Sequence, residues 1–161
     1  MTNRVIRVAV AGLPLSAKST LIASLAPEGS YSKRRHYTKI LLNIGSYTLC
    51  LMELHDVHKH IPHDLFLFTI DTTDVLSLDE AIQAYHRLTS TSKPSAICLT
   101  KTNISGLSRN SLNLAVDAPV FVINEECTFA EVLLSLLKSN SFDDDVDHGI
   151  GSCSCFCCNL M

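Results

Sequence analysis

The 161-residue chain lacks tryptophan, and aromatic residues make up only 6% of it. It also lacks an excess of positive charge, because its formal net charge is −3, so nothing predicts a nucleic-acid partner. No apolar run reaches the roughly 18 residues of a membrane-spanning helix, and residues 4–10 are too short and too charged for a signal peptide. With 47% apolar residues, the chain is long enough to fold around a core of its own.

The seven cysteines do not form the pattern of a disulfide framework. Cys50, Cys98 and Cys127 stand alone in apolar strands or at an element boundary, where a reduced cysteine behaves as a small hydrophobic residue. The other four crowd the end of the sequence. This usage predicts a reducing, cytosolic compartment and no secreted partners.

Strand and helix patterns alternate along the chain. Apolar strand patterns cover 4–11, 37–44, 47–54, 64–70, 95–100 and 119–124. Helical patterns cover 18–26, 77–88, 105–116 and 128–138, and capping-box sequences stand at Ser77–Glu80 and Thr128–Glu131. The order predicts an α/β fold with a mostly parallel sheet covered on both faces, to which the hairpin 37–54 adds one antiparallel edge strand.

The segment that follows the first strand has the pattern of a phosphate-binding loop. Residues 12–19, GLPLSAKS, match G-x-x-x-x-G-K-[ST] except that Ala17 replaces the second glycine. In this pattern Lys18 reaches the β- and γ-phosphates, Ser19 binds Mg²⁺, and the backbone N–H groups of the helix start, with Thr20, complete the site. The methyl group of Ala17 stands where backbone must approach phosphate, and where a positive φ is wanted. The alternative is an ordinary strand–turn–helix that happens to contain Lys-Ser.

From about residue 4 to residue 161 the chain resembles the Ras-like small GTPases. The hairpin 37–54 is similar to their second and third strands, LFLFTIDTTDVLSLDEAIQAYHRL to their fourth strand and following helix, and PSAICLTKTNI to the segment with the guanine-reading N-K-x-D motif. The resemblance implies a six-stranded sheet of order 2-3-1-4-5-6 and the ligands GTP or GDP with Mg²⁺.

The guanine-reading motif departs from the family pattern. Lys101, which packs over the base in the family, is retained, but Asn103 replaces the aspartate and Thr100 replaces the asparagine. An amide offers one acceptor where a carboxylate accepts two hydrogen bonds from guanine, and such a loss costs about 1.5–3 kcal/mol. Lys101 and Asn103 are therefore predicted to bind nucleotide only weakly.

The two switch regions also depart from the family. The candidate for the D-x-x-G motif is Asp56–Lys59, with lysine in place of glycine, and His60 stands where the family has its catalytic glutamine. Asp56 is predicted to hold Mg²⁺ together with Ser19. Because only residues 55–63 connect two strands, we expect the switch II helix to be lost or reduced to one turn, and hydrolysis to be very slow or absent.

The same connection contains His55, His58, His60 and His63. Neutral imidazoles bind Zn²⁺, so a metal-binding regulator is a remote alternative. The other interpretation is a solvated loop.

The C-terminal tail carries the pattern of a lipid anchor. The last four residues, Cys158–Met161, match C-a-a-X apart from Asn159, and Cys157-Cys158 also resembles a double-cysteine prenylation end. One prenyl chain anchors only marginally and residues 143–147 are acidic, so acylation of Cys153, Cys155 and Cys157 is the expected second signal. The alternatives are a disordered tail and a small cysteine metal clip.

Together these patterns predict a small-GTPase-like domain over 1–139 and a flexible acidic, lipidated tail over 140–161. The predicted function is a protein-interaction module with weakened nucleotide binding, working with effector or scaffold proteins on the cytoplasmic face of a membrane. The alternative is a divergent but functional switch, whose slow GTPase activity is assisted by a partner.

Overall fold

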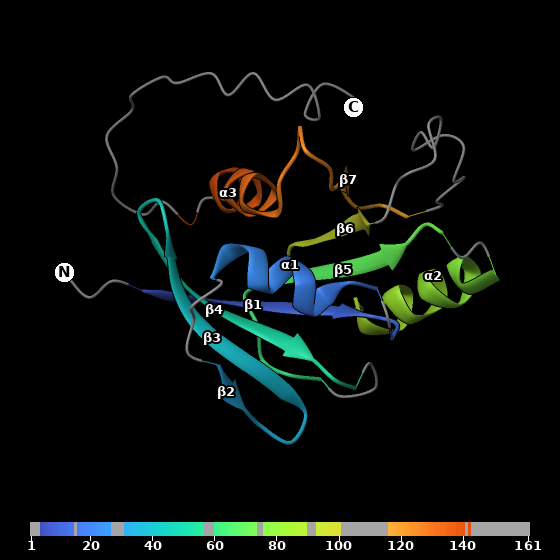
Figure 1. Cartoon of the computed structure of the whole chain (residues 1–161), viewed down its shortest axis with the longest axis horizontal. Coiled ribbons are helices and arrows are strands. Elements are labelled where there is room, and N and C mark those ends of the chain that lie inside the picture. Colours follow the sequence, from blue (N-terminus) through green and yellow to red (C-terminus); the bar gives the residue numbers. More distant parts are fainter. Residues whose placement is uncertain are drawn as a thin grey trace.

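The structure is a computed structural model that describes residues 4–14, 16–26, 31–56, 60–73, 76–89, 93–100, 116–140 and 142. The strands are β1 (Val5–Gly12), β2 (Ser32–Lys33), β3 (Tyr37–Ile44), β4 (Tyr47–Leu54), β5 (Leu65–Asp71), β6 (Ser95–Thr100) and β7 (Val120–Val122). The helices are α1 (Lys18–Leu25), α2 (Leu76–Leu88) and α3 (Phe129–Ser139). Figure 1 shows the strands as one twisted sheet with helices around it.

The sheet has the order β2-β3-β4-β1-β5-β6-β7, which confirms the predicted order and adds one strand at the edge. The β1 strand pairs in parallel with β4 and β5, and β5–β6 and β6–β7 are parallel as well. The β3 strand pairs antiparallel with β4 through the predicted hairpin. The added strand, β2, was not predicted because two residues are too short to show a periodic pattern.

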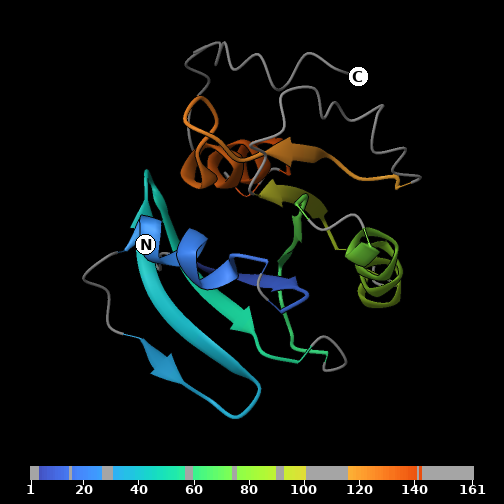
Figure 2. The ribbon, with the colours of Figure 1, turned by 45° about the vertical axis from the view of Figure 1, so that its right-hand side comes forward.

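Both faces of the sheet are covered, as the apolar runs predict. Val8 and Val10 of β1 pack in one core with α1 and α3, and Ala9 and Ala11 pack in the other core with α2. In Figure 2 the helix α2 stands apart from α1 and α3, on the other side of the sheet. A parallel strand covered on both faces has a nearly continuous apolar sequence. For this reason the sequence predicts β1 and β5.

The two capping-box predictions have different outcomes. The side chain of Thr128 accepts from the backbone N–H of Glu131, and the Glu131 side chain accepts from the backbone N–H of Thr128, so α3 begins as predicted. The helix α2 is confirmed and begins at Leu76, one residue before the predicted start, while the cap by the Ser77 side chain lies outside what the structure describes and stays a prediction. The helix predicted over 105–116 falls outside the described residues except for Val116, which is not helical.

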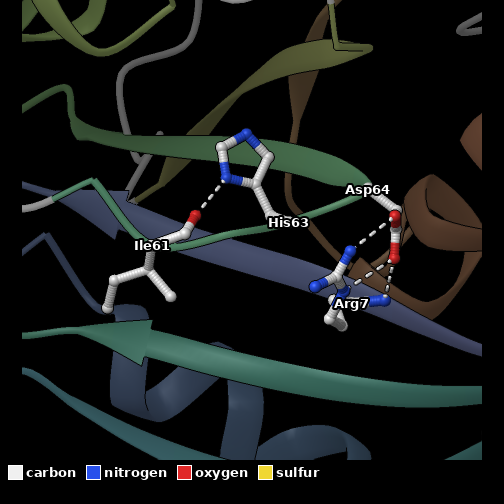
Figure 3. A network of polar contacts seen from close by, with 4 residues as sticks. All are labelled: Arg7, Ile61, His63 and Asp64. Atoms are coloured by element: carbon white, nitrogen blue, oxygen red, sulfur yellow. Dashed lines mark hydrogen bonds and ion pairs between the residues drawn. The ribbon is translucent and has the colours of Figure 1, made fainter.

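A bidentate ion pair joins β1 to the segment that leads into β5 (Figure 3). Arg7 donates from Nε to Asp64 Oδ2 and from Nη2 to Oδ1, both at 3.1 Å, and its backbone N–H donates to Oδ2 at 2.9 Å. These contacts hold the pKa of the Asp64 carboxyl below its usual value. The ion pair fixes where the chain enters β5, at the end of the sheet away from the carboxyl end of β1.

Candidate phosphate-binding loop

The loop 12–19 connects β1 to α1 at the carboxyl end of the central strand. Gly12 lies against β5 so closely that a Cβ atom there would stand 2.6 Å from the carbonyl oxygen of Thr69, and the position therefore accepts only glycine. Ala17 immediately precedes α1 with φ 64° and ψ 20°, in the left-handed region. It is the one non-glycine residue with positive φ in the described part of the chain. The backbone thus has at Ala17 the conformation that the missing glycine would favour.

The Lys18 side chain folds back over the loop. Its Nζ donates to the carbonyl oxygens of Gly12 and Leu13 at 3.0 Å each and to Ser16 Oγ at 3.4 Å. Burial lowers the pKa of the Lys18 amine, and the nearby carboxylate of Glu53 acts in the opposite direction. The loop thus holds a cation beside its own backbone, the arrangement that a phosphate group requires.

Two neighbouring strands hold the loop in place. Ser16 is 1% exposed, and a 2.7 Å hydrogen bond joins its Oγ to Thr69 Oγ1 of β5. Thr100 Oγ1, at the end of β6, donates to the carbonyl oxygen of Ser16 at 3.3 Å and to that of Ile70 at 3.2 Å. Thr100, which stands in place of the family's asparagine at the start of the guanine-reading motif, therefore links the end of β6 to the phosphate loop.

A carboxylate reaches the first turn of α1 from the neighbouring strand β4. Ser19 Oγ donates to Glu53 Oε1 at 2.5 Å, and Glu53 stands in register with Val10 of β1. Sequence reasoning missed Glu53, although it is the one acidic residue in the apolar run YTLCLMEL. The predicted metal ligand Asp56 lies two residues beyond the end of β4, and its role stays a prediction. A hydroxyl and a carboxylate side by side are oxygen ligands of the kind that suit Mg²⁺, so the donor set fits the predicted cation.

The remaining predicted site residues fall in three places. Thr20 is exposed in the first turn of α1. Lys101 and Asn103 lie outside the described residues, and so do Cys153, Cys155, Cys157 and Cys158. Among the described helices none is long and apolar enough to cross a membrane.

The described histidines of the connection 55–63 do not all share one set of partners. His55 Nε2 makes a 2.8 Å hydrogen bond with Thr38 Oγ1, while the rings of His60 and His63 lie 5.8 Å apart. His58 is outside the described residues. Within the described part of the chain, no three histidine, cysteine or acidic side chains gather into a metal site.

No family model matches the chain, and no curated protein matches its sequence. Solved structures do match it. The cytosolic domain of the T. maritima FeoB iron transporter in its apo form aligns with a TM-score of 0.66 and 15% identity, over 91% of this chain and 67% of that one. Arl6 (BBS3), a small GTPase from Trypanosoma brucei with bound GppNp, aligns with a TM-score of 0.67 and 16% identity, over 88% of this chain and 100% of that one.

The GDP-bound IFT22 of T. brucei aligns with a TM-score of 0.61 and 13% identity, over 87% of this chain and 98% of that one. Identities this low establish the fold alone. The chain has the fold of the Ras-like P-loop GTPases, as its sequence predicted.

Proposed function

We propose that this chain is a membrane-anchored, small-GTPase-like interaction module that binds GTP or GDP weakly and hydrolyses it very slowly or not at all. The proposal that the chain binds a nucleotide rests on the conformation of the phosphate loop. Ala17 holds the left-handed backbone that the motif needs, and Lys18 Nζ lies directly over the loop. Both features are those that a bound phosphate group would use.

The residues of the loop would act on a nucleotide as follows. Lys18 exchanges its carbonyl contacts for phosphate oxygens, since an ammonium group binds an anion more strongly than a neutral carbonyl. The backbone N–H groups that open α1 donate to the same phosphates. Ser19 would hold Mg²⁺ beside Glu53, and bound Mg²⁺ neutralises phosphate charge.

Three sequence features support weak binding and slow chemistry. The Ala17 methyl group crowds the path of the phosphates, and Asn103 loses the bidentate contact to guanine. Lys59 and His60 replace the glycine and glutamine that contact the γ-phosphate and orient water in the family. The described part of the connection between β4 and β5 contains no helix, in keeping with a lost switch II helix. It consists of residues 55, 56 and 60–64.

A titration with a fluorescent GDP analogue tests the nucleotide part. We expect saturable binding weaker than nanomolar, turnover at or near background, and loss of binding in Lys18→Ala. Lys138→Ala, an exposed lysine near the end of α3, is the control and binds as wild type does. Nanomolar binding with turnover would refute the weakened site. Equal binding by wild type and Lys18→Ala would refute the role of the loop.

The membrane part rests on the tail sequence. The full chain expressed in eukaryotic cells is expected to carry a prenyl group on Cys158 or Cys157, with acyl groups on the upstream cysteines, and to sediment with membranes. The variant in which Cys157 and Cys158 are both serine should move to the soluble fraction. An unmodified C-terminal peptide, identified by mass spectrometry of the wild-type protein, would contradict the anchor.

The second candidate function is a divergent switch whose hydrolysis a partner assists, for example by supplying an arginine. The contacts of Lys18 and the Ser19–Glu53 pair favour it. They keep the side chain that would bind phosphate close to the side chains that would bind Mg²⁺. In that case the titration gives tight binding, and turnover appears only when the partner is added.

A further inference from the structure

We propose that the sheet face around Cys50 is the docking site of an acidic segment of this same chain, residues 143–150. The face lies over the first half of β1, away from the phosphate loop, and the segment follows the last described residue, Phe142. This inference goes beyond the proposed function, because it needs neither a bound nucleotide nor a lipid.

Three neighbouring strands build this face, each through alternate residues. Two rows cross β1, β4 and β3 in register, and they are Val5–Thr48–Asn43 and Arg7–Cys50–Leu41. The residues between them along each strand point to the opposite side of the sheet, into the core that contains α1 and α3. The two rows therefore form one continuous patch, on the side of the sheet that carries α2.

The patch leaves apolar side chains in contact with solvent. Leu41 is 63% exposed and Val5 is 43% exposed, and Cys50 between them is half-buried. The helix α2 packs mainly on β1 and β5, and Figure 2 shows it (green) on the other side of the view from β3 (cyan). Within the described residues, no helix covers the β3 part of this face. Neighbouring exposed apolar side chains favour a covering segment.

Positive charges border the patch. Burial raises the pKa of the Cys50 thiol, and Lys39 and Arg7 act in the opposite direction, so both cations lie near it. Arg7 is already paired with Asp64, but neither Lys39 nor Arg4 makes an ion pair with a carboxylate in the described part of the chain. The patch is therefore complementary to a segment that carries carboxylates together with apolar side chains.

The sequence that follows Phe142 has this composition, and it starts beside the patch. The ring centroid of Phe142 lies 6.0 Å from the guanidinium carbon of Arg4, the residue before Val5. Residues 143–150, DDDVDHGI, carry four carboxylates and two branched apolar side chains. Because adjacent strands lie about 4.8 Å apart, β3 is roughly 10 Å from β1, and eight extended residues span up to about 26 Å. The segment is long enough to cross the patch.

Cys50 is a natural reporter of this docking. In the full chain with Cys153, Cys155, Cys157 and Cys158 all changed to serine, the other two cysteines are 0% and 2% exposed. The rate at which uncharged N-ethylmaleimide modifies Cys50 then measures access to the patch. We expect this rate to be about tenfold lower than in the same protein shortened to end at Phe142. Tenfold protection corresponds to a docking free energy of ~1.4 kcal/mol.

Charge variants show which part of the segment is responsible. Asparagine at positions 143, 144, 145 and 147 of the full chain should remove most of the protection. The matched control changes four exposed carboxylates elsewhere to amides and keeps the protection; these are Glu80, Asp117, Glu125 and Glu126. Sodium chloride at about 1 M should remove the protection of the full chain and leave the rate of the shortened chain unchanged, because salt screens exposed charges.

The outcomes are decisive in each case. Equal rates for the full and shortened chains at low salt would overturn the proposal. Protection that survives the four asparagines, or that grows with protein concentration, would also overturn it, the latter because a second copy then covers the patch. Mass spectrometry counts the modified cysteines, so a variant that unfolds is recognised by modification of Cys98 and Cys127. In that event the folded asparagine variant decides. None of these results bears on nucleotide binding, which the titration tests separately.

Discussion

Single residues decide how far the phosphate loop departs from its pattern, and Ala17 is the most informative of them. An L-residue in the left-handed region costs roughly 1–2 kcal/mol, because Cβ crowds the following carbonyl oxygen. The structure nevertheless keeps Ala17 at φ 64°. The surrounding contacts of Ser16 and Lys18 compensate for this cost, so the loop retains its shape without its second glycine.

Ala17→Gly is therefore expected to stabilise the protein. Relief of the left-handed strain exceeds the extra entropy of glycine in the unfolded chain, and the net gain in the free energy of unfolding is roughly 0.5–1 kcal/mol. Urea denaturation measures it. Ala23→Gly, an exposed position inside α1, is the control and should lose about 0.5–1 kcal/mol. If both variants lose stability alike, Ala17 is unstrained.

At the scale of elements, the segment that leads into β5 contains a buried histidine. His63 is 7% exposed, its Nδ1 bonds the carbonyl oxygen of Ile61 at 2.7 Å (Figure 3), and its ring lies 5.4 Å from that of Phe66. Nε2 has no hydrogen-bond partner among the described residues. Burial lowers the pKa of His63, with His60 and Lys93 acting in the same direction and the Ile61 carbonyl and Asp64 opposing it.

The sign of the resulting pH dependence follows from linkage. Since the native pKa is below 6.5, the unfolded state takes up the proton first as the pH falls. The free energy of unfolding should therefore decrease below about pH 6.5, by up to ~1.4 kcal/mol per pH unit, until the native pKa is reached. His63→Phe removes this part of the slope in urea denaturation between pH 7 and pH 5, whereas exposed His86→Phe keeps it. A wild-type slope in His63→Phe would contradict the assignment.

Elements were predictable to the extent that their pattern is local. The β5 and β6 strands are continuous apolar runs, and the capping box of α3 needs only four consecutive residues, so both were found. The β2 strand has two residues and no pattern, and α2 begins one residue before the position that the sequence indicated. The Ser19–Glu53 contact joins residues 34 positions apart and depends on the register of β4 with β1, which no motif encodes.

At the scale of the whole molecule, the order of the strands explains which residues surround the phosphate loop. The sheet order places β1 centrally, between β4 and β5, so the loop at its end is reached by Glu53 of β4, Thr69 of β5 and Thr100 of β6. This convergence is the physical basis for expecting a nucleotide site. The residues on which the proposed weakening rests follow strands in the sequence, where loops vary without disturbing the core.

The nucleotide content of the purified full-length protein tests this account most directly. The protein is denatured and the supernatant is separated by ion-exchange chromatography, and the folded protein is then titrated with millimolar GTP and Mg²⁺. We predict little or no nucleotide after purification, together with saturable binding when GTP is added. No binding at millimolar GTP would contradict the account and leave the loop 12–19 as a structural remnant, while stoichiometric GDP or GTP after purification would contradict the weakened site.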